Sequence, residues 1–111
     1  MGTIVTHETG NRVMVTEVLT LTADASAVDL RADLLGGYLY CAEIYATADD
    51  SVTLTINSGL GTEMLSLAAT GATSGEYGTP TAYYPITRIP NYTVSGIGSG
   101  TVTIEITVVK I

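Results

Sequence analysis

Residues 101–110, near the end of the chain, alternate aliphatic and polar side chains from Thr101 as far as Val108. The aliphatic phase consists of Val102, Ile104, Ile106 and Val108. Because successive side chains of a strand point to opposite faces of a sheet, this period of two predicts a β-strand with one buried face. Residues 52–57 alternate just as strictly. Residues 12–22 alternate around an apolar phase that contains Val13, Val15, Leu19 and Leu21.

The remaining extended segments are less regular. Residues 38–47 are apolar on both phases, which predicts a central strand with Tyr38, Tyr40, Ala42 and Ile44 on one face and Leu39, Cys41 and Tyr45 on the other. Residues 62–68 follow the turn at Asn57 as the second strand of a hairpin. Residues 82–87 and 92–95 are short strand candidates beside prolines. Residues 23–37 and 69–80 are predicted loops, the first with one helical turn.

The pattern as a whole predicts an all-β fold. Seven or eight antiparallel strands, with turn signals at short intervals and no helical periodicity, favour a two-sheet β-sandwich, jelly-roll-like or immunoglobulin-like. Residues 1–11 are predicted as an extended N-terminal arm and residues 12–111 as a single β-sandwich domain. A length of 111 residues falls within the usual size of one domain.

The composition changes the picture of the surface. The chain is 46% hydrophobic but only 14% charged, against about 25% charged in typical globular proteins. Much of the surface must therefore consist of uncharged Thr, Ser, Gly and Tyr. Phe and Trp are absent and there are seven tyrosines, whose polar tips favour sheet edges and interfaces over the centre of a core. Such a surface suits contact with other proteins.

The net charge excludes one class of partner. It is −7, with only four basic residues, whereas nucleic-acid affinity depends mainly on Lys and Arg contacts to phosphates. The N-terminal residues lack the basic and apolar regions of a signal peptide, and no segment approaches the ~20 apolar residues of a membrane span. We therefore expect neither nucleic acid nor a membrane as partner, and folding in a cytoplasm.

Candidate catalytic and metal-binding residues are few. The chain has one histidine, His7, and one cysteine, Cys41. A Cys/His nucleophilic pair needs contact and a third orienting group, so a strand histidine and a buried thiol are the commoner interpretation. Zinc needs three or four ligands of this kind, which one histidine and one cysteine do not supply. Asp49 and Asp50 are the calcium candidates, although no known calcium-loop spacing surrounds them and solvated turn carboxylates are commoner. The sequence predicts no catalytic residue and no cofactor.

Aromatic residues supply the candidate contact surface. The protein-contact candidates are four tyrosines and two arm residues, namely Tyr77, Tyr83, Tyr84, Tyr92, Ile4 and Val5. Tyrosines near Arg88 and Asn91 could also stack on sugar rings. The alternative function is therefore a carbohydrate- or receptor-binding β-sandwich module of a phage tail or adhesin.

Three segments together resemble small structural proteins of tailed bacteriophage particles. They are Leu-Thr-Leu-Thr-Ala-Asp-Ala-Ser at 19–26, Val-Thr-Leu-Thr-Ile-Asn at 52–57 and Gly-Ser-Gly-Thr-Val-Thr-Ile at 98–104. The turn after the second segment often contains Asp in such proteins, whereas this chain has Asn57. The resemblance covers most of residues 12–111 and carries no catalytic residues.

The resemblance implies a virion component assembled in the host cytoplasm. Its implied role is that of a capsid decoration (cement) protein on the outside of the phage head, with a minor head or tail component as the near alternative. The implied partners are the major capsid protein or other virion proteins. Self-association into a homo-oligomer is also implied, a trimer by the resemblance and a dimer by the general prevalence of dimers.

Overall fold

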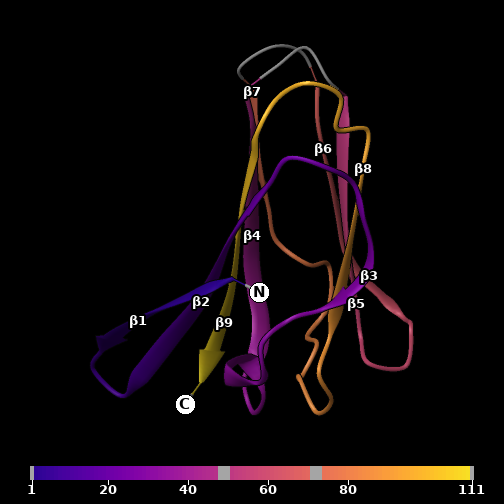
Figure 1. Ribbon diagram of the computed structural model, residues 1–111. Coiled ribbons are helices and arrows are strands. Elements are labelled where there is room, and N and C mark those ends of the chain that lie inside the picture. Colours follow the sequence, from indigo (N-terminus) through magenta and orange to yellow (C-terminus); the bar gives the residue numbers. More distant parts are fainter. Residues whose placement is uncertain (1, 48–50, 71–73, 111) are drawn as a thin grey trace.

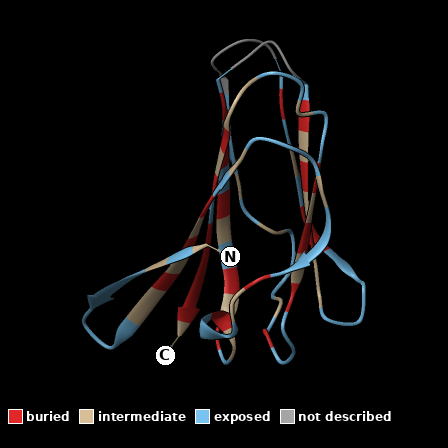
Figure 2. Ribbon diagram, in the orientation of Figure 1, coloured by how far each residue is buried: buried red, intermediate tan, exposed pale blue. Residues whose placement is uncertain are grey.

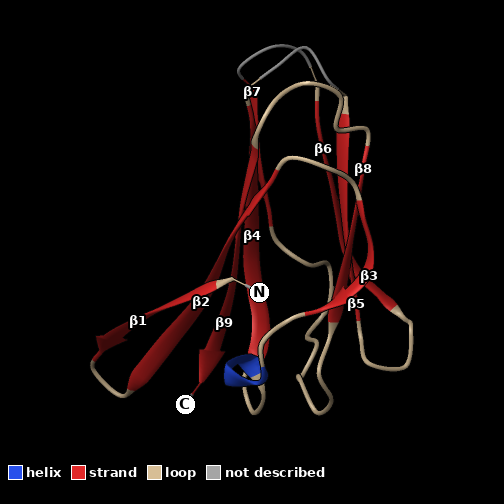
Figure 3. Ribbon diagram, viewed as in Figure 1, coloured by secondary structure: helices blue, strands red, loops and turns tan. Residues whose placement is uncertain are grey.

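The computed structural model describes residues 2–47, 51–70 and 74–110. Within these residues the chain forms nine strands and one 3-10 turn (Figures 1 and 3). In chain order the elements are β1 (Thr3–Thr9), β2 (Arg12–Leu21), β3 (Ala25–Asp29), η1 (Ala32–Leu34), β4 (Tyr38–Ala46), β5 (Val52–Asn57), β6 (Glu63–Ala69), β7 (Ser74–Gly78), β8 (Asn91–Ser95) and β9 (Val102–Lys110).

The strands form two antiparallel sheets that face each other. The larger sheet has the order β1-β2-β9-β4-β7 and the smaller has the order β3-β8-β5-β6. Strands β2 to β9 follow the order of a jelly roll, in which successive strands cross between the sheets except β5 and β6, which pair as a hairpin, and β1 is added at the edge beside β2. The predicted all-β sandwich is confirmed. Of the two alternatives, the strand order matches the jelly roll and not the immunoglobulin fold.

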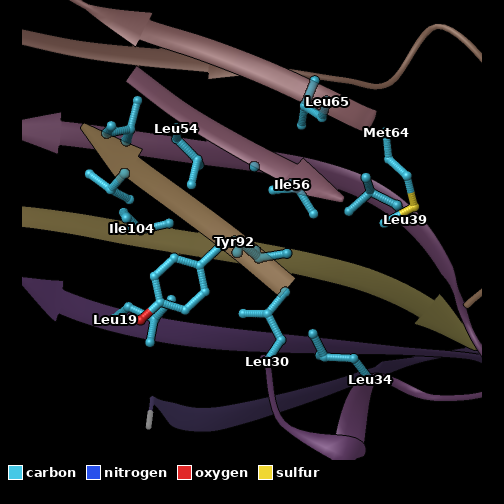
Figure 4. Packing of buried hydrophobic residues seen from close by; sticks show 14 of the residues in the cluster. Leu19, Leu30, Leu34, Leu39, Leu54, Ile56, Met64, Leu65, Tyr92 and Ile104 are labelled. Carbon is cyan, nitrogen blue, oxygen red and sulfur yellow. The ribbon is translucent and has the colours of Figure 1, made fainter. Parts of the chain in front are cut away.

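Aliphatic residues of the two inner faces meet in the core. Leu54, Ile56 and Tyr92 of the smaller sheet face Leu19 and Ile104 of the larger sheet (Figure 4). The strictly alternating residues of 52–57 and 102–108 supply the centre of this cluster, because their aliphatic phase is almost completely buried. Each such side chain contributes about 1.5–3 kcal/mol through burial.

The first two strands form a hairpin that leans away from the sandwich (Figure 1). β1 pairs with β2 from Thr3 opposite Val18 to Thr9 opposite Arg12. Only Ile4 of β1 packs against the core, and the rest of the strand is exposed (Figure 2). Residues 3–9 of the expected arm are therefore an edge strand with little cover from the second sheet.

A buried carboxylate fixes the base of this hairpin. Glu17 is 0% exposed and lies in the inward phase of β2 between Val15 and Leu19. Its Oε1 accepts a hydrogen bond of 2.7 Å from the Arg31 backbone N–H, and its Oε2 accepts one of 3.1 Å from the Gly2 N–H. The Arg31 Nη1 donates in turn to the Gly2 carbonyl at 3.1 Å. This network joins the start of β1 to the segment between β3 and η1.

Several element predictions were wrong. Nine strands are described because β1 lies in the expected arm, β3 in the predicted loop 23–37 and β7 in the predicted loop 69–80. The predicted helical turn is confirmed as η1. Residues 82–87 form no strand, only one bridge between Tyr38 and Pro85, since proline has no N–H to donate to a ladder.

Candidate functional site

The outward face of β4 is rich in tyrosine because of a β-bulge. The pairing of β4 with β9 shifts between Leu39 and Cys41, so one extra residue separates two runs of opposite phase. Leu39, Ala42 and Ile44 are buried. Tyr38 and Tyr40 point outward before the bulge, and Cys41 and Tyr45 after it. The predicted division of this strand into two faces was therefore wrong, because alternation was counted straight through the bulge.

Two further tyrosines extend this surface. Tyr77 of β7 pairs with Glu43 of β4 and is 59% exposed. Tyr83 is 70% exposed, and its ring lies 5.0 Å from that of Tyr38, centroid to centroid, with the planes tilted by 39°. We call the set Tyr38, Tyr40, Tyr45, Tyr77 and Tyr83 the tyrosine face. It gathers five of the seven tyrosines on one side of the larger sheet.

Contacts within the tyrosine face are polar as well as aromatic. A hydrogen bond with Cys41 raises the pKa of Tyr77 above its usual value, and the nearby Tyr40 and Glu43 raise the pKa further. The Tyr77 hydroxyl is therefore neutral at physiological pH and able to donate. The ring of Tyr45 covers Gly75 of β7, where an added Cβ would come within 3.1 Å of that ring. A glycine in this edge strand therefore lets the tyrosine lie flat on it.

Two carboxylates lie in the middle of the larger sheet's outward face. Glu105 of β9 is directly opposite Glu43 of β4, with Val18 beyond Glu105 and Tyr77 beyond Glu43 in the same row. Both glutamates are exposed. The next row is uncharged and contains Thr16 and Thr107, whose hydroxyls hydrogen-bond at 2.8 Å. The centre of the face is thus acidic, within a surface of tyrosine, threonine and aliphatic groups.

The predicted contact residues are distributed over three environments. Tyr77 and Tyr83 belong to the tyrosine face, and Val5 is 53% exposed on the outward side of β1. Ile4 and Tyr84 pack partly against the core. Tyr92 is 3% exposed in the core, so its ring is not accessible to a partner in this structure, because the alternating phase of β8 points it inward.

The structure does not bring together the candidate nucleophilic pair, His7 and Cys41. His7 lies on β1 and Cys41 on β4, with β2 and β9 between them, a separation of roughly 14 Å at the usual strand spacing. Asp49 and Asp50 lie outside the described residues. Among the residues that are described, no group of three or more His, Cys, Asp or Glu is placed to hold a metal ion. No helix in that part of the chain has the length and apolarity of a membrane span.

A groove on the other side of β7 provides a second candidate site. It has a volume of about 310 Å³ and lies between β6 and the segment that follows β7. Its polar lining includes Glu63, Ser66 and Thr81, and Tyr84 supplies the aromatic surface. This is the size of a small-ligand pocket, although the groove is open to solvent.

Sequence reasoning missed Tyr38, Tyr40 and Tyr45 as surface residues, together with the pair Glu43 and Glu105. The sequence contains a partial sign of this surface. Residues 38–47 are apolar on both phases, and such a strand must either be covered on both faces or expose one apolar face. Which face would be exposed depended on the bulge and on pairing partners far apart in the chain.

Comparison with known proteins supports the fold. No family model matches the chain, and no curated protein matches it significantly. Among solved structures, it is similar to a Bacillus endospore appendage subunit from a family described as disulfide-linked pili, with 21% identity over 89% of this chain and 87% of that one, at a TM-score of 0.58. The capsid protein of the Macrobrachium rosenbergii extra small virus particle has 9% identity over 93% and 81% of the chains, at 0.40. The likeness to the appendage subunit indicates the fold alone.

Proposed function

We propose that this chain is a non-enzymatic structural protein of a virus particle, a decoration (cement) protein on the outside of a bacteriophage head. The observation that carries the proposal is the tyrosine face, an exposed sheet surface whose tyrosines surround the acidic pair Glu43 and Glu105. Tyrosine is enriched at protein interfaces. We therefore assign this face to contact with neighbouring protein subunits.

The size of the face fits such a role. Tyr40 and Tyr45 are each 41% exposed, and Tyr77 and Tyr83 are more so. At about 150–250 Å² for each whole aromatic side chain, these four rings offer roughly 400 Å². That is about half of the ~800 Å² that each partner contributes to a stable interface. The adjacent Val18 and Thr103, which are half-buried, extend the same surface.

The resemblance to phage structural proteins supports the particle and its location, and the jelly-roll order is one that viral capsid proteins use. The similarity to a pilus subunit supports the same class of role, because that protein assembles into an appendage. We expect the chain to associate with itself, as a trimer by the resemblance or as a dimer, and with the shell protein of its particle.

Co-sedimentation tests the proposal. The coding sequence would be located in its genome, and the shell protein encoded beside it would be assembled into empty shells. The chain is expected to sediment with those shells, and Y77S/Y83S is expected to weaken the binding, whereas L60S, at a tip that is 78% exposed on the other sheet, leaves it unchanged. Failure to bind these shells would overturn the decoration role.

The groove beside Tyr84 favours one alternative, a carbohydrate-binding module. It combines a half-buried tyrosine with the carboxylate of Glu63 and the hydroxyls of Ser66, Thr79 and Thr81 within about 310 Å³. A glycan array probed with the purified chain, with and without calcium, tests this role. A Tyr84→Ala variant should lose any signal that arises in the groove, and an array without signal removes the alternative.

A further inference from the structure

We propose that the tyrosine face receives the β1–β2 hairpin of a second copy of this chain, with Arg12 of that copy placed over Glu43 and Glu105. The inference rests on the proposed structural role and names the partner of its contact surface. It is carried by the charges on the outward face of the larger sheet and by the exposure of the hairpin.

The acidic pair, Glu43 and Glu105, forms no salt bridge within the part of the chain that the structure describes. Directly opposite residues of an antiparallel pair have Cβ atoms about 4.5–5.5 Å apart, and like charges there destabilise the sheet. Among the described residues, the salt bridge found joins Arg31 and Asp33. Glu105 and Val109 share the outward phase of β9. Lys110 follows Val109 directly and is therefore on the inward phase. Among the described residues, the pair Glu43 and Glu105 therefore has no basic partner, and a neighbouring molecule can supply one.

The hairpin supplies the opposite charge. Residues of β1 and β2 that share the outward side of the sheet are Val5, His7, Thr9, Arg12, Met14 and Thr16. This surface is aliphatic and hydroxylic with a basic residue near its tip, and Glu8 points to the other side of the hairpin. Arg12 is six residues along β2 from Val18, or roughly 20 Å from the acidic row, so it reaches Glu43 only in another copy.

The geometry also selects the manner of self-association. Placing two tyrosine faces directly on each other would bring four carboxylates together, and like-charge contacts across an interface cost several kcal/mol. The hairpin leans out of the sandwich, and its outer strand β1 is exposed except at Ile4 (Figure 2), so this strand is free to cover a neighbour. Such a contact joins two different surfaces, which closes into a ring or forms twice in a dimer.

Arginine suits this position for two reasons. Its planar guanidinium can bind carboxylates in a bidentate manner. It also stacks on aromatic rings, and Tyr77 lies beside Glu43 in the same row. Val5 and Met14 on the hairpin would then pack on the surrounding tyrosine rings. The contact thus combines charge pairing at its centre with aromatic packing around it.

Complementation between two variants tests the inference. Light scattering and sedimentation equilibrium would be measured for the parent, R12E and E43K/E105K. The parent is expected to self-associate, and each variant to weaken association by about tenfold or more. Mixing the two variants should restore association, because Arg12 of the second meets the intact glutamates of the first. R88E, which changes an exposed arginine outside the sheet, is the matched control and should associate like the parent.

The outcomes separate this inference from the proposed function. A parent that is monomeric, an R12E variant that associates normally, or a mixture that stays dissociated would each overturn the inference. Circular dichroism of each variant establishes that it is folded. A monomeric parent that still binds shells leaves the decoration role standing and assigns the cation to the shell. A parent that self-associates but does not bind shells leaves the self-association inference standing and overturns the decoration role.

Discussion

Replacement of Glu17 by glutamine probes the network that holds the hairpin in place. The carboxylate is completely buried and accepts two backbone hydrogen bonds, from Gly2 and from Arg31. Glutamine has nearly the same shape but only one acceptor oxygen. If that oxygen keeps the shorter bond to Arg31, the amide NH₂ faces the Gly2 N–H, and two donors then oppose each other.

The expected loss of stability follows from this geometry. A hydrogen bond to a charged group contributes about 1.5–3 kcal/mol, and leaving a buried donor unsatisfied costs about 1–3 kcal/mol. We expect E17Q to lower the free energy of unfolding by about 2–3 kcal/mol and E17L, which removes both acceptors, by about 4 kcal/mol. These are large fractions of the 5–15 kcal/mol that is usual for a domain.

Urea denaturation followed by circular dichroism measures the loss, and hydrogen exchange at the Arg31 amide reports the broken bond locally. Glu63→Gln is the matched control, because Glu63 is exposed at the start of β6, and its change should stay within about 0.5 kcal/mol. An E17Q variant as stable as the parent, with Arg31 exchange unchanged, would refute the assigned role of this carboxylate.

Three other predictions concern the core and the turns. Ile104→Ala empties a site that is 0% exposed and should cost about 2–5 kcal/mol in urea denaturation; a smaller loss would mean a loosely packed core. Gly96→Ala should cost more than Gly10→Ala, because both glycines have positive φ but only at Gly96 would the added Cβ collide with the Ser51 carbonyl; equal melting temperatures would contradict this. Burial raises the pKa of Tyr92, so the unfolded chain releases this proton first and stability should fall as pH rises from about 10 through the folded-state pKa. Y92F should reduce that alkaline loss, and an identical pH profile would count against it.

The regular strands were predictable because their cause is local. Residues 52–57 and 101–108 alternate strictly, and the structure buries the expected phase of each. The same periodicity places Glu17 in the buried phase of β2. No pattern in the sequence shows that Gly2 and Arg31 would satisfy it, since those residues come from distant parts of the chain.

The missed elements depend on pairing rather than on periodicity. β7 has the sequence Ser-Gly-Glu-Tyr-Gly, which looks like a loop, and it becomes a strand because β4 offers it an edge. Its glycines are accommodated by neighbours, with Tyr45 over Gly75 and Leu67 against Gly78. β3 is short, bulged and at an edge, and one of its residues, Ala27, has a φ of 47°.

The candidate site was predictable only in its composition. Seven tyrosines and few charges indicated a contact surface, and two of the predicted contact residues, Tyr77 and Tyr83, are exposed in the structure; their contact role stays a prediction. The bulge between Leu39 and Cys41 decided which residues of β4 would join them. The opposition of Glu43 and Glu105 required the register of two strands about sixty residues apart in sequence.

The central claim is that the outward face of the larger sheet is a protein contact surface. Hydroxyl-radical footprinting of the chain, free and bound in its assembly, measures this directly for each tyrosine. The account predicts strong protection of Tyr77 and Tyr83 on assembly, while Leu60 on the β5–β6 turn stays as reactive as in the free chain. Equal reactivity of Tyr77 and Tyr83 in the two states would contradict the claim.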